Sequence, residues 1–204
     1  MLSCCNIGVT VEGMDLFKGL GFSLFPGSIL IVEGKNGIGK SSLLKTLATL
    51  QPNYNGYILY NDINIQDALE EFRHLLCYIG HKPALFEELT VYDNLALWAQ
   101  LNNRELSIHA AIAVFGLNDY LDVKVATLSK GWQKKVALTK ALLTNAKVWL
   151  LDEPFTNLDK ESTGRLKDMI AAKSQQNGII IITSHQHIDM NSATRINLGD
   201  FTYE

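Results

Sequence analysis

The chain has 204 residues, of which 47% are hydrophobic and 19% are charged, and its formal net charge is -3. This size and composition predict one globular domain spanning residues 1–204 with a sizeable buried core. The negative charge argues against a nucleic-acid partner held mainly by electrostatics, so we expect none. No apolar run reaches the roughly 18 residues that a membrane-spanning helix needs, and we expect no direct membrane insertion.

The first ten residues, MLSCCNIGVT, lack the basic start and long apolar stretch of a secretory signal. Cys4, Cys5 and Cys77 have no metal-ligand spacing, and adjacent cysteines rarely pair with each other. Such thiols are typical of a reducing compartment, so we expect a cytoplasmic protein. If the protein acts at a membrane, another polypeptide must supply the spanning part.

Short β-like runs occupy the first third of the chain, at residues 22–25, 29–33 and 57–60. Pro-Gly and Asn-Gly pairs separate them, as turns do between strands. We therefore expect an antiparallel β portion at this end of the chain.

Directly after the second run, residues 34–42 read GKNGIGKSS, and a helix-like run follows. Strand, glycine-rich turn and helix in this order predict a P-loop. Gly34, Gly37 and Gly39 can take backbone angles closed to other residues, so that N–H groups turn inward around a phosphate chain. A chance glycine-rich turn is the alternative, and the flanking strand and helix patterns argue against it.

Each part of this loop has a predicted role in binding ATP. The ammonium of Lys40 is expected to reach the β- and γ-phosphates, and the hydroxyl of Ser41 is expected to ligate Mg²⁺. The candidate nucleotide-binding residues are Gly34, Lys35, Asn36, Gly37, Ile38, Gly39, Lys40, Ser41 and Ser42. ATP and Mg²⁺ are therefore the expected ligands.

Helical signals dominate a stretch at about residues 85–145, which we predict to be a helical insert. The predicted helices cover residues 91–101, 108–115 and 130–143, with Thr90 and Ser107 as N-caps and Gly116 as a stop. We expect the apolar residues of this insert, Trp98 included, to form its core.

The last third of the chain alternates strand and helix. Residues 148–151 and 179–183 are almost entirely apolar, as parallel strands buried on both faces are. Between them, Asp159 is the predicted N-cap of a helix that reaches Asn177, with Gly178 after it. The whole pattern predicts an α/β fold with a mostly parallel sheet core, an antiparallel β portion and a helical insert.

Asp152 and Glu153 follow the apolar run at residues 148–151. Carboxylates at the C-terminal end of a buried parallel strand lie on the edge where such sheets bind ligands. Asp152 is predicted to hold the Mg²⁺ shell, and Glu153 to polarise the water that attacks the γ-phosphate. Many strands end in a solvated acid, and it is the upstream P-loop that favours a catalytic pair here.

With these motifs in order, the chain resembles the ATP-binding subunits of ABC transporters over nearly its whole length. Residues 128–133, LSKGWQ, are similar to the LSGGQ signature of that family, residues 155–159 to its D-loop, and His185 to its switch histidine. The resemblance implies a P-loop NTPase fold of ABC ATPase type and a head-to-tail dimer, in which ATP lies between the P-loop of one copy and the signature of the other. A serine that starts a helix suits this role, because its hydroxyl and the nearby N–H groups offer an anion site. The resemblance adds to the candidate site residues Ser129, Gly131, Asp159 and His185.

A closer resemblance is to the cytochrome c biogenesis ATP-binding protein A family, the haem exporter ATPases. It rests on residues 78–90, YIGHKPALFEELT, on residues 136–138, VAL, and on residues 151–159, LDEPFTNLD. The family implies integral membrane partners of a cytochrome c maturation complex and a peripheral place on the cytoplasmic face of the cell membrane. No residue of the sequence establishes contact with haem, since the chain has no Cys-x-x-Cys-His and its histidines are scattered.

The chain departs from the ABC pattern at several positions. His81 stands where most ABC ATPases have a glutamine that touches Mg²⁺ or the attacking water, so it is a candidate catalytic residue, with a surface-loop role as the alternative. Lys130 and Trp132 replace a glycine and the glutamine of the signature, while its serine and second glycine are kept. No aromatic residue for stacking on adenine is evident near residues 11–13.

Several other functions share part of this pattern. They are the ATP-binding subunit of another ABC transporter, a soluble ABC ATPase without a membrane partner, a P-loop kinase and an adaptor that binds ATP without turnover. A soluble ABC ATPase usually carries tandem domains or long inserts, which this sequence does not show. A kinase needs an arginine-rich lid, of which the nearest imitation is formed by Lys124, Lys130, Lys134 and Lys135. The presence of Glu153 argues against the adaptor.

Overall fold

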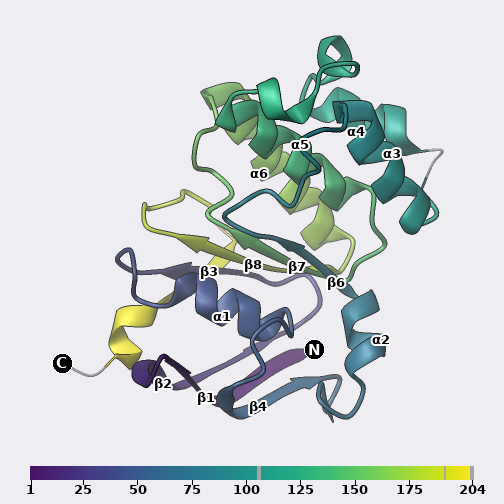
Figure 1. Ribbon diagram of the computed structural model, residues 1–204. Helices are drawn as coiled ribbons and strands as arrows, with labels where there is room; N and C mark the ends of the chain where they lie inside the picture. Colours follow the sequence, from purple (N-terminus) through teal and green to yellow (C-terminus); the bar gives the residue numbers. More distant parts are fainter. Residues whose placement is uncertain (105–106, 191, 203–204) are drawn as a thin grey trace.

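Two β-sheets organise the chain in the computed structural model, which describes residues 1–104, 107–190 and 192–202. One sheet has four strands in the order β2-β1-β4-β5, paired antiparallel. The other has five strands in the order β6-β7-β8-β3-β9, paired parallel. The predicted combination of a parallel core, an antiparallel β portion and a helical insert is confirmed (Figure 1).

The antiparallel sheet consists of β1 (Leu2–Val11), β2 (Met14–Leu24), β4 (Tyr54–Tyr60) and β5 (Ile63–Asn64). The parallel sheet consists of β3 (Ile29–Glu33), β6 (Leu76–Ile79), β7 (Val148–Asp152), β8 (Ile179–Ser184) and β9 (Ala193–Asn197). The predicted strand at residues 29–33 is β3 itself, whereas the run at 57–60 is the end of a longer strand and Phe25 lies beyond the end of β2. The sequence does not predict β1, because irregularities in its pairing interrupt the period of two that marks a strand.

The helices are α1 (Lys40–Leu47), α2 (Leu69–His74), α3 (Val91–Leu101), α4 (Ile108–Val114), α5 (Lys130–Leu142) and α6 (Lys160–Gln175). Short 3₁₀ helices lie at η2 (Asn118–Tyr120), η3 (Val125–Thr127) and η4 (Leu198–Phe201). The predicted helix starts in the insert are confirmed, and the predicted ends of α4, α5 and α6 lie one or two residues too far. None of the helices in the described part of the chain has the length and apolar character to cross a bilayer.

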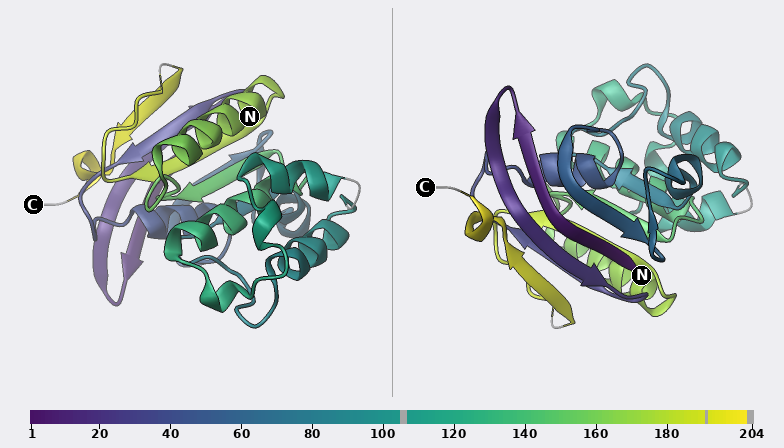
Figure 2. Two further views of the ribbon diagram at one scale, coloured as in Figure 1. Left: turned by 90° about the horizontal axis from the view of Figure 1, so that it is seen from above. Right: turned by 90° about the horizontal axis from the view of Figure 1, so that it is seen from below.

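Successive side chains of the parallel strands point into two different cores. In β3, Ile29 and Ile31 pack with α3 to α6, while Leu30 and Val32 pack with α1 and the antiparallel sheet. Figure 1 shows α1 between the two sheets and α5 and α6 on the opposite face, and Figure 2 shows the same layers from above and below. Burial on both faces explains why these strands are continuous apolar runs in the sequence.

The helical insert begins with a well-defined N-cap. Thr90 Oγ1 accepts a hydrogen bond from the N–H of Asp93 at 3.0 Å, as predicted. The buried amide of Asn94 bonds both the N–H and the C=O of Phe86, at 2.8 and 3.0 Å, which holds the loop before α3 against the helix. The capping prediction for Ser107 is wrong, because its backbone is already helical (φ −95°, ψ −4°) and its side chain makes no capping bond to the described residues.

Candidate active site

The loop between β3 and α1 has its glycines where the sequence predicts unusual backbone angles. Gly34, Gly37 and Gly39 have φ values of +151°, +82° and +109°. Gly39 also lies so close to Phe17 that a Cβ atom would come within 3.1 Å of its ring. The loop therefore curls as a phosphate-binding loop must, and it ends at the N-terminus of α1.

The side chain of Lys40 folds back across this curl. Its Nζ donates to the carbonyl oxygens of Gly34 at 2.7 Å and Lys35 at 3.1 Å, and it lies 3.5 Å from Oε1 of Glu153. The residue is only 6% exposed. A buried ammonium in this place suits a ligand that carries negative charge, such as a phosphate chain.

Asp152, at the end of β7, offers a place for a cation. Its Oδ1 accepts a hydrogen bond from Thr183 Oγ1 at 2.7 Å, while its Oδ2 is buried without a hydrogen-bond partner among the described residues. A buried carboxylate oxygen that lacks a donor is suited to a metal ion. Asp152 lines a cavity of about 490 Å³, and Ser41, in the first turn of α1, lines it too. The residues predicted for Mg²⁺ therefore fit that metal.

Glu153 has a left-handed backbone conformation, with φ of +46°, which is uncommon for a residue other than glycine. Its N–H donates to Thr183 Oγ1 at 3.0 Å. Its Oε2 lies 2.7 Å from Nδ1 of His185, and its Oε1 is the atom that approaches Lys40. The P-loop, the end of β7 and the segment after β8 thus meet at one carboxylate.

A cavity of about 540 Å³ lies beside these groups. Among the predicted residues it brings together Asn36, Gly37, Gly39, Lys40, Ser41, Ser42, His81, Glu153 and His185. Leu16 and Thr156 line it as well, and the sequence predicts neither. Of the remaining loop residues, Gly34 and Lys35 contribute the carbonyls that hold the lysine, and Ile38 packs against the core beneath the antiparallel sheet.

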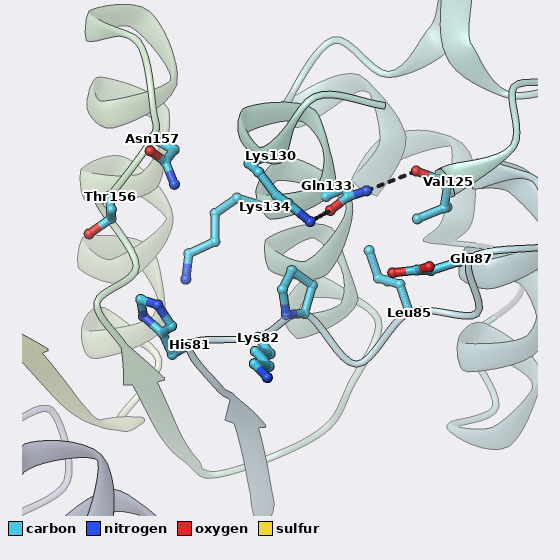
Figure 3. A pocket seen from close by; sticks show the side chains of 11 residues that line it. His81, Lys82, Leu85, Glu87, Val125, Lys130, Gln133, Lys134, Thr156 and Asn157 are labelled. Carbon is cyan, nitrogen blue, oxygen red and sulfur yellow. Dashed lines mark hydrogen bonds between the residues drawn. The ribbon is translucent and has the colours of Figure 1, made fainter. Parts of the chain in front are cut away.

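His81 follows the end of β6 and lines two neighbouring cavities. One is the cavity at the P-loop. The other, of about 480 Å³, lies between the loop after β6 and α5 (Figure 3). The side chain is exposed, so that water can reach it. This position beside the P-loop is compatible with the predicted catalytic role of His81, which stays a prediction.

The signature residues lie apart from the P-loop cavity. Ser129 caps α5, with Oγ accepting from the N–H of Trp132 at 3.4 Å. Gly131 is so close to the D-loop that a Cβ atom would come within 2.7 Å of the carbonyl oxygen of Asn157. Neither Ser129 nor Gly131 lines the P-loop cavity, as far as the described residues define it.

Asp159 joins two helices. Its Oδ1 accepts from the N–H of Ser162 at 2.7 Å as the N-cap of α6, and its Oδ2 pairs with Nζ of Lys135 on α5 at 2.8 Å. The Lys135 ammonium and the bonds from Ser162 hold the pKa of this carboxyl well below its usual range. The N-cap prediction is confirmed.

Comparison with known proteins agrees with this geometry. The model of the ABC transporter family matches residues 17–156. A protein of Wolbachia pipientis wMel called cytochrome c biogenesis ATP-binding export protein CcmA is 38% identical over 202 residues, which are 98% of both chains. A protein of the same name from Aliivibrio fischeri is 36% identical over 98% of this chain and 100% of its own length. The chain belongs to this family.

Membership of the CcmA family confirms the resemblance and makes the chain an ABC-type ATPase subunit. The solved structure of a putative ABC transporter ATP-binding protein from Pyrococcus furiosus superposes with a TM-score of 0.85 at 25% identity, covering 99% of each chain. A second solved structure, of an ATP-binding subunit of an ABC transporter, has a TM-score of 0.81 at 26% identity over 91% of this chain and 79% of its own. The predicted ABC ATPase fold is thereby confirmed.

The sequence does not assign two side chains that hold the peptide group between Asp152 and Glu153. They are Thr183, described above, and Lys134, whose Nζ donates to the carbonyl oxygen of Asp152 at 3.1 Å. Burial lowers the pKa of Lys134 to about 8, while the two carboxylates act in the opposite direction. Asp152 pairs with Thr183 only through the register of β7 and β8, which no local motif reveals.

Proposed function

We propose that this protein hydrolyses Mg·ATP as the nucleotide-binding subunit of a membrane complex for c-type cytochrome maturation, with haem as the species exported or released. The observation that carries the hydrolytic part is the meeting of three side chains at one sheet edge, where Glu153 lies 2.7 Å from His185 and 3.5 Å from Lys40. The names of the relatives, cytochrome c biogenesis ATP-binding export proteins, support the cytochrome part.

In this proposal the P-loop binds the β- and γ-phosphates of ATP through its N–H groups and the Lys40 ammonium. Ser41 and Asp152 would hold Mg²⁺, which neutralises charge on the phosphates when it is bound. The buried, unpartnered Oδ2 of Asp152 supports this assignment. The rest of the loop, residues 34–42, would provide the cradle.

Glu153 takes the proton from the attacking water, because its carboxylate lines the P-loop cavity and approaches the loop lysine. His185 keeps that carboxylate turned toward the phosphates through its Nδ1. His81, which lines the same cavity from the loop after β6, hydrogen-bonds the water in place of the usual glutamine. Proton transfer of this kind typically contributes about 10²- to 10⁴-fold to a rate.

A second copy of the chain completes each site with its own Ser129 and Gly131. Support comes from the position of these residues at the N-terminus of a helix of 13 residues, whose dipole favours an anion, and from their distance from the P-loop cavity of their own chain. The D-loop residue Asp159 would lie beside this closed interface.

The proposal further includes one ABC ATPase domain over residues 1–204, on the cytoplasmic face of the membrane, bound to integral membrane subunits of the maturation complex. No described helix can span a bilayer by itself, so the spanning part is assigned to those partners. The word "export" in the names of the relatives supports the same arrangement.

The test uses Glu153→Gln, which keeps the shape of the side chain but not its basicity. With ATP and Mg²⁺, we expect a stable dimer with bound nucleotide in light scattering and a hydrolysis rate at least about 100-fold below wild type. An unchanged rate would remove Glu153 from its role.

The cytochrome part is tested in a bacterium that lacks its own CcmA. The wild-type chain should restore haem-stained c-type cytochromes there and should co-purify with membranes in an active complex. The Glu153→Gln variant should do neither.

A further inference from the structure

We propose that Lys134 is a positioning residue for Glu153: its ammonium holds the peptide group that aims the carboxylate, and it does so from the helix that carries the signature. This inference rests on the proposed role of Glu153 as the base. It concerns a side chain that is neither in the P-loop nor among the residues that touch nucleotide in the proposal above.

The peptide group between Asp152 and Glu153 is held by side chains at both of its polar atoms. Its carbonyl oxygen accepts from Lys134 Nζ at 3.1 Å, and its N–H donates to Thr183 Oγ1 at 3.0 Å. Thr183 in turn donates to Asp152 Oδ1 at 2.7 Å. The peptide therefore cannot rotate without losing hydrogen bonds on two sides.

Glu153 needs this hold because of its own backbone. A φ of +46° is unfavourable for a residue with a Cβ atom and persists only where the surroundings enforce it. Rotation of the preceding peptide would let the residue return to a common conformation. The carboxylate would then swing away from Lys40 and His185, its present neighbours.

Lys134 is buried where its ammonium meets the carbonyl oxygen of Asp152. It is 5% exposed, and within the described residues its ammonium has no carboxylate at ion-pair distance. Figure 3 shows the side chain leaving α5 and extending into the cavity toward His81. Water solvates an ammonium far better than such a site does, and methionine would fill the same space without that penalty. A role for the charged donor explains why a lysine stands here.

The start of α5 is fastened to the segment after β7 at further points. Lys135 Nζ lies 2.8 Å from Asp159 Oδ2. Gly131 leaves no room for a Cβ atom beside the carbonyl of Asn157. A shift of α5 is therefore transmitted to the peptide that Lys134 holds. In the proposed dimer, the helix that offers its N-terminus to the partner's nucleotide also sets the carboxylate of its own site.

The test compares Lys134→Met with Lys140→Met in the full chain. Lys140 is the matched control, because it lies on the same helix, is 8% exposed, and donates from Nζ to a carbonyl oxygen, that of Ala84, at 2.7 Å. We expect K134M to lower kcat about 10- to 100-fold relative to K140M, as loss of a positioning contact does. The Kd for Mg·ATP, measured by calorimetry, should differ by less than about twofold between the two variants. Lys134→Arg, which can still donate to the carbonyl, should recover most of the rate.

A second readout does not depend on hydrolysis. Hydrogen exchange at the Glu153 amide should be faster in K134M than in K140M, while exchange in β3 and the melting temperature stay the same in both. Equal kcat values in K134M and K140M, or equal exchange at Glu153, would overturn the inference. If K134M hydrolyses ATP as fast as K140M and Glu153→Gln does not hydrolyse it, only the inference fails. If wild type and Glu153→Gln hydrolyse ATP equally, the proposed function itself fails.

Discussion

The P-loop edge of the parallel sheet and the N-terminal end of α5 are both suited to phosphate, but they are built in different ways. At the P-loop edge, β3, β7 and β8 end side by side, and Lys40 is buried among groups from two of the connecting segments. At α5, Ser129 is exposed and its hydroxyl serves as a local cap. The first region gathers the groups proposed to bind metal and to catalyse within one chain, because parallel strands end at a common edge. The second offers a helix end, which in the proposed dimer is completed by the P-loop edge of the partner copy.

Removal of the buried ammonium of Lys40 should have the largest effect on the P-loop edge. Lys40→Ala takes away the positive charge inside the loop, and we expect ATP binding to weaken about 100-fold or more in calorimetry. Lys147→Ala, at an exposed position before β7 and outside the cavities of the site, is the control and should bind ATP within about twofold of wild type. Full affinity of the Lys40→Ala variant would contradict the P-loop assignment.

A negative charge at the N-terminal end of α5 should impair the function of that end while the P-loop edge keeps its own. Ser129→Asp keeps a good N-cap for α5 but opposes a phosphate, so hydrolysis and ATP-dependent dimerisation should fall about 100-fold while the chain's own P-loop still binds ATP. Ser129→Asn, which also caps but is neutral, is the control.

A mixture of two variant subunits tests the dimer more directly. We expect Ser129→Asp and Lys40→Ala subunits to be nearly inactive on their own. A mixed dimer has one intact pair of P-loop and signature, so part of the wild-type rate should return. A mixture as inactive as its components would count against the head-to-tail dimer.

His81 should have a smaller effect, because it lines the P-loop cavity without belonging to the loop. His81→Gln restores the usual ABC residue and should keep kcat within about threefold of wild type, while His81→Ala should lose about tenfold. Steady-state hydrolysis at saturating Mg·ATP measures both. Wild-type activity in the alanine variant would make this histidine an ordinary surface residue.

The contact between Asp159 and Lys135 should have the smallest effect, and we expect it to be measurable in the stability of the fold. The pKa of Asp159 is lowered in the folded chain, so its contribution is fully present above the unfolded-state value of about 4 and is lost as the pH falls below it. Asp159→Asn keeps the cap, and because the Asp159 side chain is exposed its melting temperature at pH 7 should lie at most about 4 °C below wild type, a difference that shrinks as the pH falls below about 4. Asp168→Asn, at an exposed position of the same helix, should show no such trend.

The parts of the molecule that the sequence predicts well are those set by neighbouring residues. The glycines of the P-loop, the carboxylates at the end of β7 and the Thr90 cap depend on local geometry, and the structure has each of them in the expected place. Leu16 and Thr183 join the site only through the folding of distant strands, so no local pattern reveals them. Ser107 shows the opposite error, since a residue suited to capping stands where the backbone has already turned into the helix.

The left-handed backbone at Glu153 sets a limit on what this position can become. Glycine or asparagine would suit the geometry better, but neither carries a carboxylate. The amino acid preferred by the chain's shape and the one required by its chemistry therefore differ at this single site. In a descendant that retained the fold but no longer turned over nucleotide, residue 153 is where glycine or asparagine should appear early.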